Sequence, residues 1–470
     1  MRRTKIVCTI GPASRSPAVL ERLIEAGMDV ARLNFSHGTH ADHRDVVEAI
    51  RRISTAHGRP VAVLQDLSGP KIRIGPMAEG TVDIETGSML TLTARQVPGD
   101  AREVSVSHPA LPRGVSSGDT ILLADGALEL EVLETTAEDI RCDVRIGGPL
   151  SSHKGVNIPT SSLDVPSLTD KDMTDLAFGI QCGVDYIGLS FVRTATDLHE
   201  ARRIVEAHGR AVPLVAKIEK HEAVANMDEI IDAADGIMVA RGDLGVETPL
   251  ERGPLVQKRL IERSNLAGKP VITATQMLRS MVENPRPTRA EVTDVANAVL
   301  DGTDAVMLSE ETAVGAYPVE SVAMMARIAQ DAESALAFTS RPWDAGPQVA
   351  ASLGESVGRA ACDLARHIDA AAIITFTQSG STPKLVAKHR PRQLILAPTP
   401  LESSYRRLSL VWGVVPILSE AAKDTDEMLR KALDESLKSG LVRKGQRVVI
   451  TSGVPMGVPG STNLIEVHVL

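Results

Sequence analysis

The sequence predicts an α/β protein built on a closed (β/α)₈ TIM barrel, with an all-β lid domain inserted into it and an open α/β domain at the carboxyl end. Three observations predict this fold. A short β-branched run followed by an amphipathic stretch repeats from Lys5 to Leu336, and this alternation implies parallel strands with crossover helices. Residues 68–163 lack helical periodicity, and βα alternation resumes on a smaller scale near residue 350.

The barrel is expected to comprise residues 1–67 and 164–338. Eight strand-like segments lie in these ranges, and eight βα units are the number that closes such a barrel. The stretches between them space apolar residues by three and four, and several end in glycine, for example at Gly27 and Gly183. The predicted strands are KIVCTIG, VARLNFS, VAVLQDL, YIGLSFV, PLVAKIE, GIMVARG, PVITATQ and AVMLSEE.

The inserted segment, residues 68–163, alternates apolar and polar side chains between turn residues, as in LELEVLE. It leaves the carboxyl end of the third strand, the face where barrel enzymes keep their chemistry, so we expect it to act as a lid.

Two prolines and a glycine in SRPWDAGPQ (340–348) break the helical pattern before the third domain. That domain, residues 339–470, is expected to form an open α/β sheet flanked by helices. Its predicted strands are AAIITFT, QLILAPT, GVVPILS, RVVITSG and LIEVHVL.

Composition excludes several classes of protein. The 470 residues carry a net charge of -9 with scattered Lys and Arg, and only 2% are aromatic, so neither a basic nucleic-acid face nor a base-stacking platform is expected. No apolar run approaches 18 residues, which argues against a membrane role. No signal peptide is expected, and the four cysteines are widely spaced. We therefore expect reduced thiols in a cytoplasmic protein.

Polar residues recur at the carboxyl ends of the predicted strands. Buried barrel strands should be nearly all apolar, so these residues need a reason. Because the strand ends converge, acids, a lysine and an arginine distant in sequence should share one cleft; capping or rim pairing is the alternative for any single one. The residues are Thr9, Arg32, Asn34, Ser36, Asp66, Ser190, Lys217, Glu219, Asp243, Thr275, Ser309 and Glu310.

Residue types indicate part of the chemistry. Glu219 and Asp243 offer hard oxygen ligands, which suit Mg²⁺ or Mn²⁺ and disfavour zinc. Lys217 lies two residues before Glu219, so on a strand both face the same side. A metal, this lysine and Arg32 together would clamp charge on a transferring phosphoryl group. In RGDLGVE (241–247) a glycine turn is expected to lead into a helix start that binds a small carboxylate. No P-loop motif is present, so a nucleotide must bind another way.

Over its whole length the chain resembles the pyruvate kinase family. The resemblance rests on CTIGPAS, ARLNFSHG, KIEKHEAV, GIMVARGDLG, ITATQML and PRPTRAEVTDVANAVLDG, in this order. It implies the last step of glycolysis, in which a phosphoryl group passes from phosphoenolpyruvate to ADP, giving ATP, and the enolate is protonated to pyruvate.

The resemblance also implies roles for individual residues. Glu219 and Asp243 look like the ligands of the divalent ion, and Lys217 like the lysine that stabilises the moving phosphoryl group. Arg32 would contact the substrate phosphate. Gly242, Asp243 and Thr275 would hold its carboxylate, with Thr275 near the face of enolate protonation. Nucleotide contacts would come from Thr9, Pro12, Asn34, His37, Arg73 and Lys154.

One departure from the family pattern concerns a monovalent cation. Many members read Asp-Thr-Lys-Gly-Pro-Glu after the third strand and hold K⁺ there. This chain reads DLSGPK, so of the corresponding residues Asn34, Ser36 and Asp66 remain, while Leu67 replaces the threonine and Lys71 the glutamate. Losing an oxygen ligand and gaining a fixed ammonium should remove the need for K⁺. The chain is similar in this respect to the K⁺-independent subgroup. Glu310 departs from a frequent glycine without an account from the sequence.

The third domain carries a candidate effector site. The segment TQSGST (Thr377, Gln378, Ser379, Gly380, Ser381 and Thr382) follows a strand and opens a helix, so its hydroxyls and N–H groups suit a phosphate; an ordinary helix cap is the alternative. In the family this loop holds a phosphorylated allosteric activator. The nearby loop VPMGVPGS (454–461) has no basic residue to select one. A homotetramer is expected from the resemblance alone.

Two other functions share part of this pattern. A metal-dependent lyase or aldolase acting on pyruvate-like carbonyls would use the same barrel, metal and lysine, but the lid and the nucleotide motifs disfavour it. A metabolite sensor with a silenced barrel would require a broken metal or lysine position, whereas Lys217, Glu219 and Asp243 are all intact.

Overall fold

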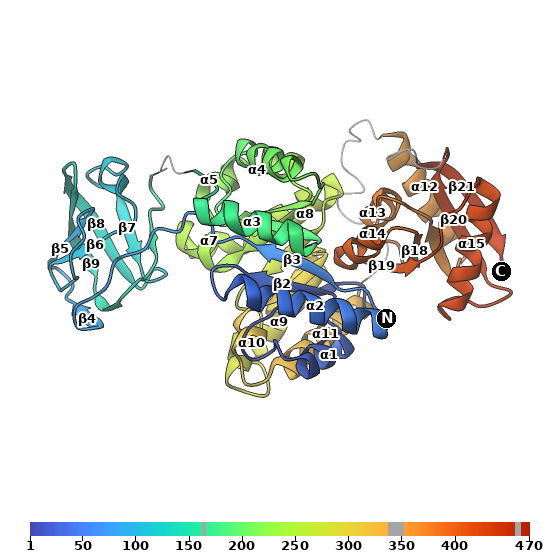
Figure 1. Ribbon diagram of the computed structural model, residues 1–470, viewed down its shortest axis with the longest axis horizontal. Coiled ribbons are helices and arrows are strands. Elements are labelled where there is room, and N and C mark those ends of the chain that lie inside the picture. Colours follow the sequence, from blue (N-terminus) through green and yellow to red (C-terminus); the bar gives the residue numbers. More distant parts are fainter. Residues whose placement is uncertain (162–165, 337–351, 456–461) are drawn as a thin grey trace.

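The computed structural model describes residues 1–161, 166–336, 352–455 and 462–470. It arranges them as a β domain, a central barrel and an α/β domain in a row (Figure 1). The predicted fold class is confirmed. The expected boundaries at 163/164 and 338/339, the break at 340–348 and residues 456–461 of the loop 454–461 lie outside the described residues.

Eight parallel strands close the barrel in the order β1-β16-β15-β14-β13-β12-β3-β2, and each matches one predicted segment. Nearly all their residues are buried, because each strand faces the barrel interior on one side and helices on the other. The strands are β1 (Lys5–Thr9), β2 (Val30–Asn34), β3 (Ala62–Asp66), β12 (Tyr186–Leu189), β13 (Leu214–Ile218), β14 (Gly236–Ala240), β15 (Val271–Ala274) and β16 (Ala305–Leu308).

Helices cover the outside of the barrel. Capping boxes at Thr39, Thr169 and Thr288 satisfy the first amides of their helices, and left-handed Gly183 and Gly302 end two of them. The helices are α1 (Pro17–Ala26), α2 (His40–Ala56), α3 (Asp170–Cys182), α4 (Ala195–Ala207), α5 (His221–Ala225), α6 (Met227–Ala233), α7 (Arg241–Glu247), α8 (Gly253–Ala267), α9 (Arg289–Asp301), α10 (Glu310–Ala313) and α11 (Pro318–Ser334), with 3₁₀ turns at η2 (Leu250–Arg252) and η3 (Arg279–Val282).

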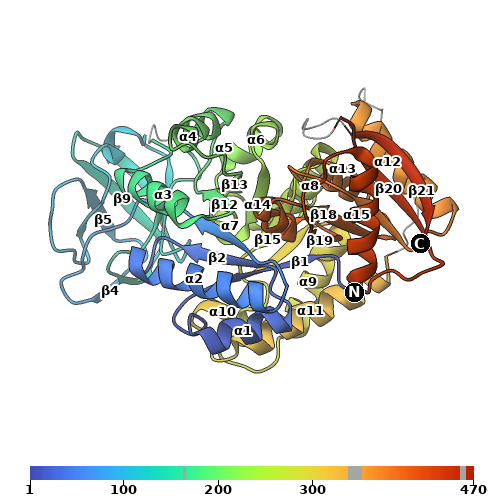
Figure 2. The same cartoon turned by 45° about the vertical axis from the view of Figure 1, so that its right-hand side comes forward.

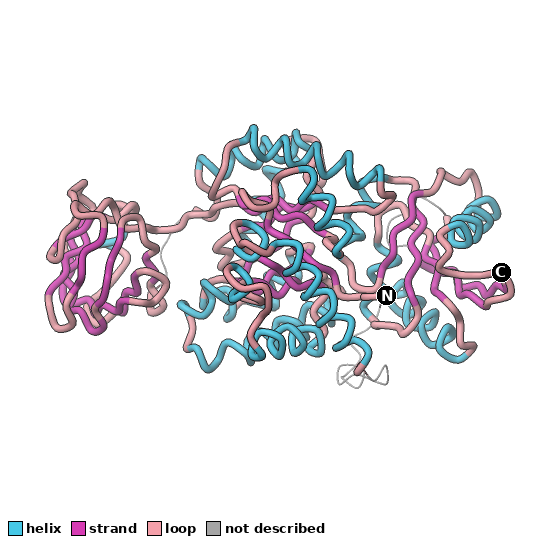
Figure 3. Tube along the Cα trace, turned by 90° about the horizontal axis from the view of Figure 1, so that it is seen from below, coloured by secondary structure: helices cyan, strands magenta, loops and turns pink. Residues whose placement is uncertain are grey.

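The inserted domain, which we call the lid, has its own apolar core and joins the barrel through a narrow connection (Figure 3). A six-stranded sheet runs β11-β7-β8-β9-β5-β6, and β10 pairs with β4. The elements are β4 (Thr81–Ile84), β5 (Met89–Thr93), β6 (Glu103–Ser105), the 3₁₀ turn η1 (Leu111–Arg113), β7 (Thr120–Leu123), β8 (Leu128–Thr135), β9 (Asp139–Ile146), β10 (Gly148–Ser151) and β11 (Val156–Asn157).

The carboxyl-terminal domain is an open sheet in the order β19-β18-β17-β20-β21, parallel except that β21 runs antiparallel to β20. All five predicted strands are present. The elements are α12 (Leu353–His367), β17 (Ala372–Thr375), α13 (Ser381–Lys388), β18 (Leu394–Thr399), α14 (Glu402–Arg407), η5 (Leu408–Leu410), β19 (Val414–Leu418), α15 (Thr425–Lys438), β20 (Arg447–Gly453) and β21 (Thr462–Val469).

This domain closes the amino end of the barrel, with β18 and β19 beside the start of the chain (Figure 2). The hydroxyl of Tyr186, inside the barrel, donates to the carbonyl of Arg407 at 2.8 Å, and Leu410 packs into the inner barrel cluster. Lys5 Nζ donates to the carbonyl of Val414 at 2.8 Å. The opposite, carboxyl end of the strands is therefore the end that remains for chemistry.

Among the described residues, every helix is too short or too polar to cross a lipid bilayer.

Candidate active site

The ammonium of Lys217 occupies the centre of the carboxyl end of the barrel. Its Nζ lies 3.1 Å from Asp66 Oδ1 and 2.9 Å from Glu219 Oε1, and it donates to Ser190 Oγ at 2.6 Å. These groups come from β3, β13 and the segment after β12, so strand ends 27 to 151 residues apart meet here. Lys217 and Glu219 are two residues apart and contact each other, as expected for side chains on the same side of a strand.

Burial makes these charges depend on one another. Asp66 and Glu219 expose only 1% and 2% of their side chains. Burial alone would raise the pKa of Asp66, but the nearby charges of Lys217 and Arg32 outweigh it and lower that pKa. Burial would likewise lower the pKa of Lys217, and the carboxylates of Asp66 and Glu219 raise it instead. Lys217 is therefore a permanently charged cation fixed in a water-poor site.

Arg32 supplies a second cation beside this group. Its Nε donates to Asp66 Oδ2 at 2.6 Å, and its Nη1 donates to Thr9 Oγ1 at 2.9 Å. Thr9 in turn donates to the carbonyl of Leu308. The guanidinium is thus held in one orientation by β1 and β3, which suits recognition of a phosphate.

Glu219 and Asp243 form the anionic side of the site. Burial raises the pKa of Glu219, the charge of Lys217 partly offsets this, and the neighbouring charge of Asp243 raises it further. A bound cation would stabilise the charged form of the buried Glu219 carboxylate. The donors are oxygen atoms, which fits Mg²⁺ or Mn²⁺. Lys71 Nζ, from the connection to the lid, lies 3.0 Å from Asp243 Oδ1.

Thr275 and Gly242 contact each other directly. The amide of Gly242 donates to Thr275 Oγ1 at 2.8 Å. The expected glycine turn before the helix is absent, because α7 begins at Arg241 and contains Gly242 in its first turn. Thr275 has φ +69°, an unfavourable left-handed conformation for a β-branched residue. Strain of this kind costs about 1–3 kcal/mol and is concentrated at functional sites.

Two residues here received no role from the sequence. Arg241 donates to the carbonyls of Ala274 and Thr275 at 3.1 Å and 2.8 Å and lies 2.7 Å from Asp294, so it braces the strained turn. Phe191 has φ +55° and donates its amide to Glu219 Oε2 at 2.8 Å. The charge of Arg241 directly after a strand could have identified it from the sequence. Phe191 acts through its backbone amide, which every residue except proline has, so its residue type gives no indication of this contact.

The residues expected to correspond to a monovalent-cation site are only partly polar. Asn34 lies beside Asp66 in the β2–β3 register, and its Oδ1 accepts from the amide of Ser36 at 3.1 Å. Leu67 is buried and offers only backbone atoms; its carbonyl accepts from Ser190 Oγ. The ammonium of Lys71 contacts Asp243 in this structure.

The residues expected to contact a nucleotide come from two places. Thr9, Pro12, Asn34 and His37 lie in or after β1 and β2 at the barrel rim, where His37 accepts on its carbonyl from His43. Arg73 and Lys154 lie on the two strands that connect the lid, and Arg73 Nη1 donates to the carbonyl of His153. One group therefore lies on the barrel rim and the other on the connection to the lid.

The loop 377–382 ends β17 and leads into α13, as expected. Gly380 has φ +82° and donates its amide to Thr377 Oγ1 at 2.9 Å, while Thr382 Oγ1 bonds Thr462 Oγ1 at 2.8 Å. Gln378 and Ser379 are exposed, and Ser379 Oγ donates to Ser381 Oγ at 3.2 Å. The loop thus presents two serine hydroxyls at a helix start.

Glu310 is the first residue of α10 and pairs with Arg279 at 2.8 Å, both being half exposed. No pattern in the sequence accounts for this glutamate, and the ion pair supplies one contact for it.

Comparisons with known proteins agree along the whole chain. The family models described as "Pyruvate kinase, barrel domain" and "Pyruvate kinase, alpha/beta domain" match residues 1–322 and 355–468. A pyruvate kinase of Geobacillus stearothermophilus is 50% identical over 472 residues, which span 100% of this chain and 80% of that protein. One from Sporosarcina psychrophila is 49% identical over 476 residues, spanning 100% and 81%. A crystal structure of a pyruvate kinase from Cryptosporidium parvum superimposes with a TM-score of 0.93 at 37% identity, covering 99% of this chain and 96% of that chain.

The cation site can be tested without any assay of activity. Glu219→Gln keeps the size of the side chain but removes its charge, so Mn²⁺ affinity measured by electron paramagnetic resonance should fall at least about 100-fold, as expected for loss of a ligand. Glu222→Gln is the matched control, because Glu222 lies three residues further on and contacts His221. Equal Mn²⁺ affinity in Glu219→Gln and the unmodified protein would refute the site.

Proposed function

The chain belongs to the pyruvate kinase family, and we propose how its own residues carry out the reaction of that family. As a phosphotransferase it uses phosphoenolpyruvate and ADP and yields ATP and pyruvate. The bond between phosphorus and the enol oxygen breaks, a bond from phosphorus to a β-phosphate oxygen of ADP forms, and the enolate carbon gains a proton.

The single observation that carries the residue assignment is the buried Lys217 ammonium between Asp66 and Glu219. A cation whose charged form is stabilised by two carboxylates and whose side chain is held by three contacts is suited to stabilise charge on a phosphoryl group in transfer. Arg32, held by Asp66 and Thr9, would bind the phosphate of the substrate.

Glu219 and Asp243 would hold the divalent ion, and the family generally uses Mg²⁺. The ion, when bound, neutralises phosphate charge and polarises the oxygens it touches. The substrate carboxylate would lie at Gly242, Asp243 and Thr275, where the Gly242 amide now donates to Thr275 Oγ1. The Thr275 hydroxyl would then lie near the carbon that is protonated.

The nucleotide would lie between rim and lid. Thr9, Pro12, Asn34 and His37 approach it from the barrel, and Arg73 and Lys154 from the lid connection. Closure of the lid would bring the two groups together and exclude water, which protects a phosphoryl group from hydrolysis.

We also propose that K⁺ is not required. The support is chemical: Leu67 provides no side-chain oxygen, and Lys71 brings a fixed ammonium to the mouth of the barrel, where it contacts Asp243. This would place the chain in a K⁺-independent subgroup.

Further proposals rest on the family relation. The chain would divide at residues 67/68, 163/164 and 338/339. It would act in the cytoplasm as a homotetramer. A phosphorylated metabolite would activate it by binding residues 377–382, where Ser379 and Ser381 hydroxyls lie at the start of α13.

The first prediction from this proposed function concerns the reaction. Release of pyruvate from phosphoenolpyruvate should require both ADP and Mg²⁺, as followed by coupled oxidation of NADH. Lys217→Ala should lower kcat by about 10²–10³-fold, the loss typical of one preorganised charge-stabilising group, and Lys438→Ala on the exposed face of α15 should not. Turnover without ADP would indicate a lyase, and no turnover at all a sensor.

The second concerns the monovalent cation. The unmodified enzyme should show full activity in buffer free of Na⁺ and K⁺. Lys71→Glu removes the ammonium, so its activity in that buffer should fall at least about tenfold and be recovered by K⁺, since a free cation then replaces the lost charge. Lys71→Arg keeps the charge and should stay independent of K⁺. Activity of the unmodified enzyme that appears only on adding K⁺ would rule the proposal out.

The third concerns the effector loop. Phosphoenolpyruvate saturation curves should shift to lower concentration with AMP or with a sugar phosphate, and the shift should shrink in Ser379→Ala with Ser381→Ala, which lack the two hydroxyls. Basal activity without effector serves as the control for folding. Saturation curves that no phosphorylated compound changes would contradict the proposed activation.

A further inference from the structure

The lid reaches the barrel through two strands that are paired with each other. Arg73 bridges to Gly155, the amide of Ile74 donates to the carbonyl of Lys154, and the amide of Val156 donates to the carbonyl of Ile72. We call these paired segments, residues 71–74 and 154–157, the neck. Because its strands share backbone hydrogen bonds, the neck should move as one unit.

One side chain from each strand of the neck bonds the same short helix of the barrel. Lys71 Nζ lies 3.0 Å from Asp243 Oδ1, and Asn157 Nδ2 donates to Glu247 Oε1 at 2.8 Å. Asp243 and Glu247 are four residues apart on α7, so they lie on the same face one turn apart. The two strands that connect the lid thus each contact α7, one at Asp243 and the other at Glu247.

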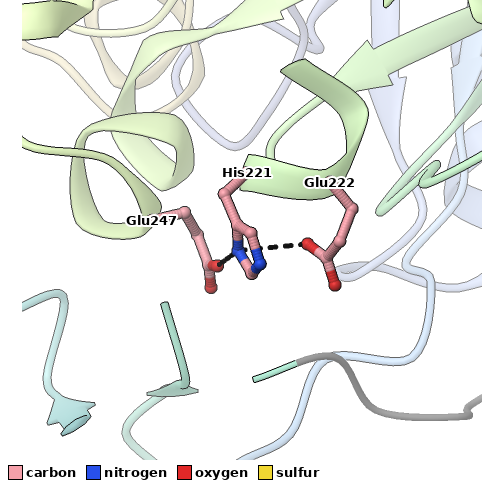
Figure 4. Close-up of side chains that lie close together, drawn as sticks. All are labelled: His221, Glu222 and Glu247. Carbon is pink, nitrogen blue, oxygen red and sulfur yellow. Dashed lines mark hydrogen bonds and ion pairs between the residues drawn. The ribbon is translucent and has the colours of Figure 1, made fainter. Parts of the chain in front are cut away.

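The carboxylate of Glu247 is buried and contacts three side chains. Its side chain has no exposed surface. Besides Asn157, Oε1 lies 2.7 Å from Lys220 Nζ, and Oε2 lies 3.3 Å from His221 Nδ1. Figure 4 shows His221 between Glu247 and Glu222. The Lys220 cation already balances the buried carboxylate, so the cluster needs no metal ion to neutralise it.

Elsewhere the neck is not tightly packed against the barrel. A cavity of ≈ 50 Å³ separates Ile72 and Asn157 on the neck from Phe191, Arg193 and Lys220 at the ends of β12 and β13. That volume exceeds the space one water requires. Apolar packing on this side therefore does not fix the angle between the neck and the barrel. The bonds of Lys71 and Asn157 to α7 can fix that angle, because they are directional.

We propose that Glu247 is a positioning residue which, with Asn157, forms a latch between the lid and α7. The latch sets the angle of the neck and, through one turn of α7, the place of Asp243. Arg73 and Lys154 lie on the neck itself, so the latch also places the lid side of the nucleotide site. This inference rests on the proposed role of these two residues in binding ADP.

Asn157→Ala should raise KM for ADP about tenfold, the effect of losing one hydrogen bond to a charged group. KM for phosphoenolpyruvate should rise less, about threefold, because Asp243 lies on the same helix one turn away from Glu247. Ser161→Ala is the matched control, because Ser161 lies four residues after Asn157 in the chain and its hydroxyl donates to Asp119 within the lid. Its KM for ADP should stay at the level of the unmodified enzyme.

Exchanging the hydrogen-bond donor and acceptor between residues 157 and 247 tests whether the latch itself, and not only the local structure, affects ADP binding. Asn157→Asp places a carboxylate against Glu247 and should raise KM for ADP more than tenfold. Adding Glu247→Gln should restore it to within about threefold, because the new amide at 247 donates to the new carboxylate at 157. Additive effects of the two changes, or an unchanged KM for ADP in Asn157→Ala and Asn157→Asp, would overturn the latch.

Hydrogen exchange distinguishes failure of the latch from failure of the proposed function. The amides of Ile74 and Val156 should exchange faster in Asn157→Ala than in the unmodified enzyme, with those of β8 and β9 unchanged. Equal exchange at Ile74 and Val156 would overturn the latch whatever the activity. Absence of ADP-dependent turnover in the unmodified enzyme would instead contradict the proposed function.

Discussion

The interaction on which the site depends is the buried contact of Lys217 with Asp66 and Glu219. Removing one partner of such a group leaves an uncompensated buried charge, which costs about 3–5 kcal/mol. Arg32 and Lys71 add two cations and Asp243 a third carboxylate, so three positive and three negative side chains balance around the mouth of the barrel. In the function proposed above, a substrate phosphate and a divalent ion would enter a site that is already close to electrical balance.

The barrel keeps the contacts that stabilise the domains at one end and the charged site at the other. Its amino end is closed by the carboxyl-terminal domain, where the guanidinium of Arg390 lies 2.9 Å from the carboxylate of Asp304 and Tyr186 bonds the carbonyl of Arg407. The polar contacts there join the two domains, and the apolar interior lies between them and the site. The carboxyl end is left with strained backbone at Phe191 and Thr275, which the surrounding strands hold in place.

Helix α7 contacts both the lid and the strand ends of the barrel. Its first turn carries Gly242 and Asp243, beside Thr275 and Lys71, and its last residue carries the Glu247 carboxylate that meets the lid at Asn157. Since Asp243 and Glu247 lie one turn apart on this seven-residue helix, the proposed latch would couple the lid angle to the position of Asp243.

The sequence by itself determined the fold class, the thirteen strands of the barrel and of the third domain, and the strand-end polar residues, because buried strands and amphipathic helices impose periodicities on residue type. Lys217, Glu219 and Asp66 were found in this way. It left out Phe191, Arg241 and the latch of Glu247 with Asn157. These act through a backbone amide, a brace on carbonyls and a bond across 90 residues, and only the packed chain decides which distant groups meet, since such contacts carry no local periodicity. The position of Lys71 on Asp243 was likewise decided by the tertiary structure.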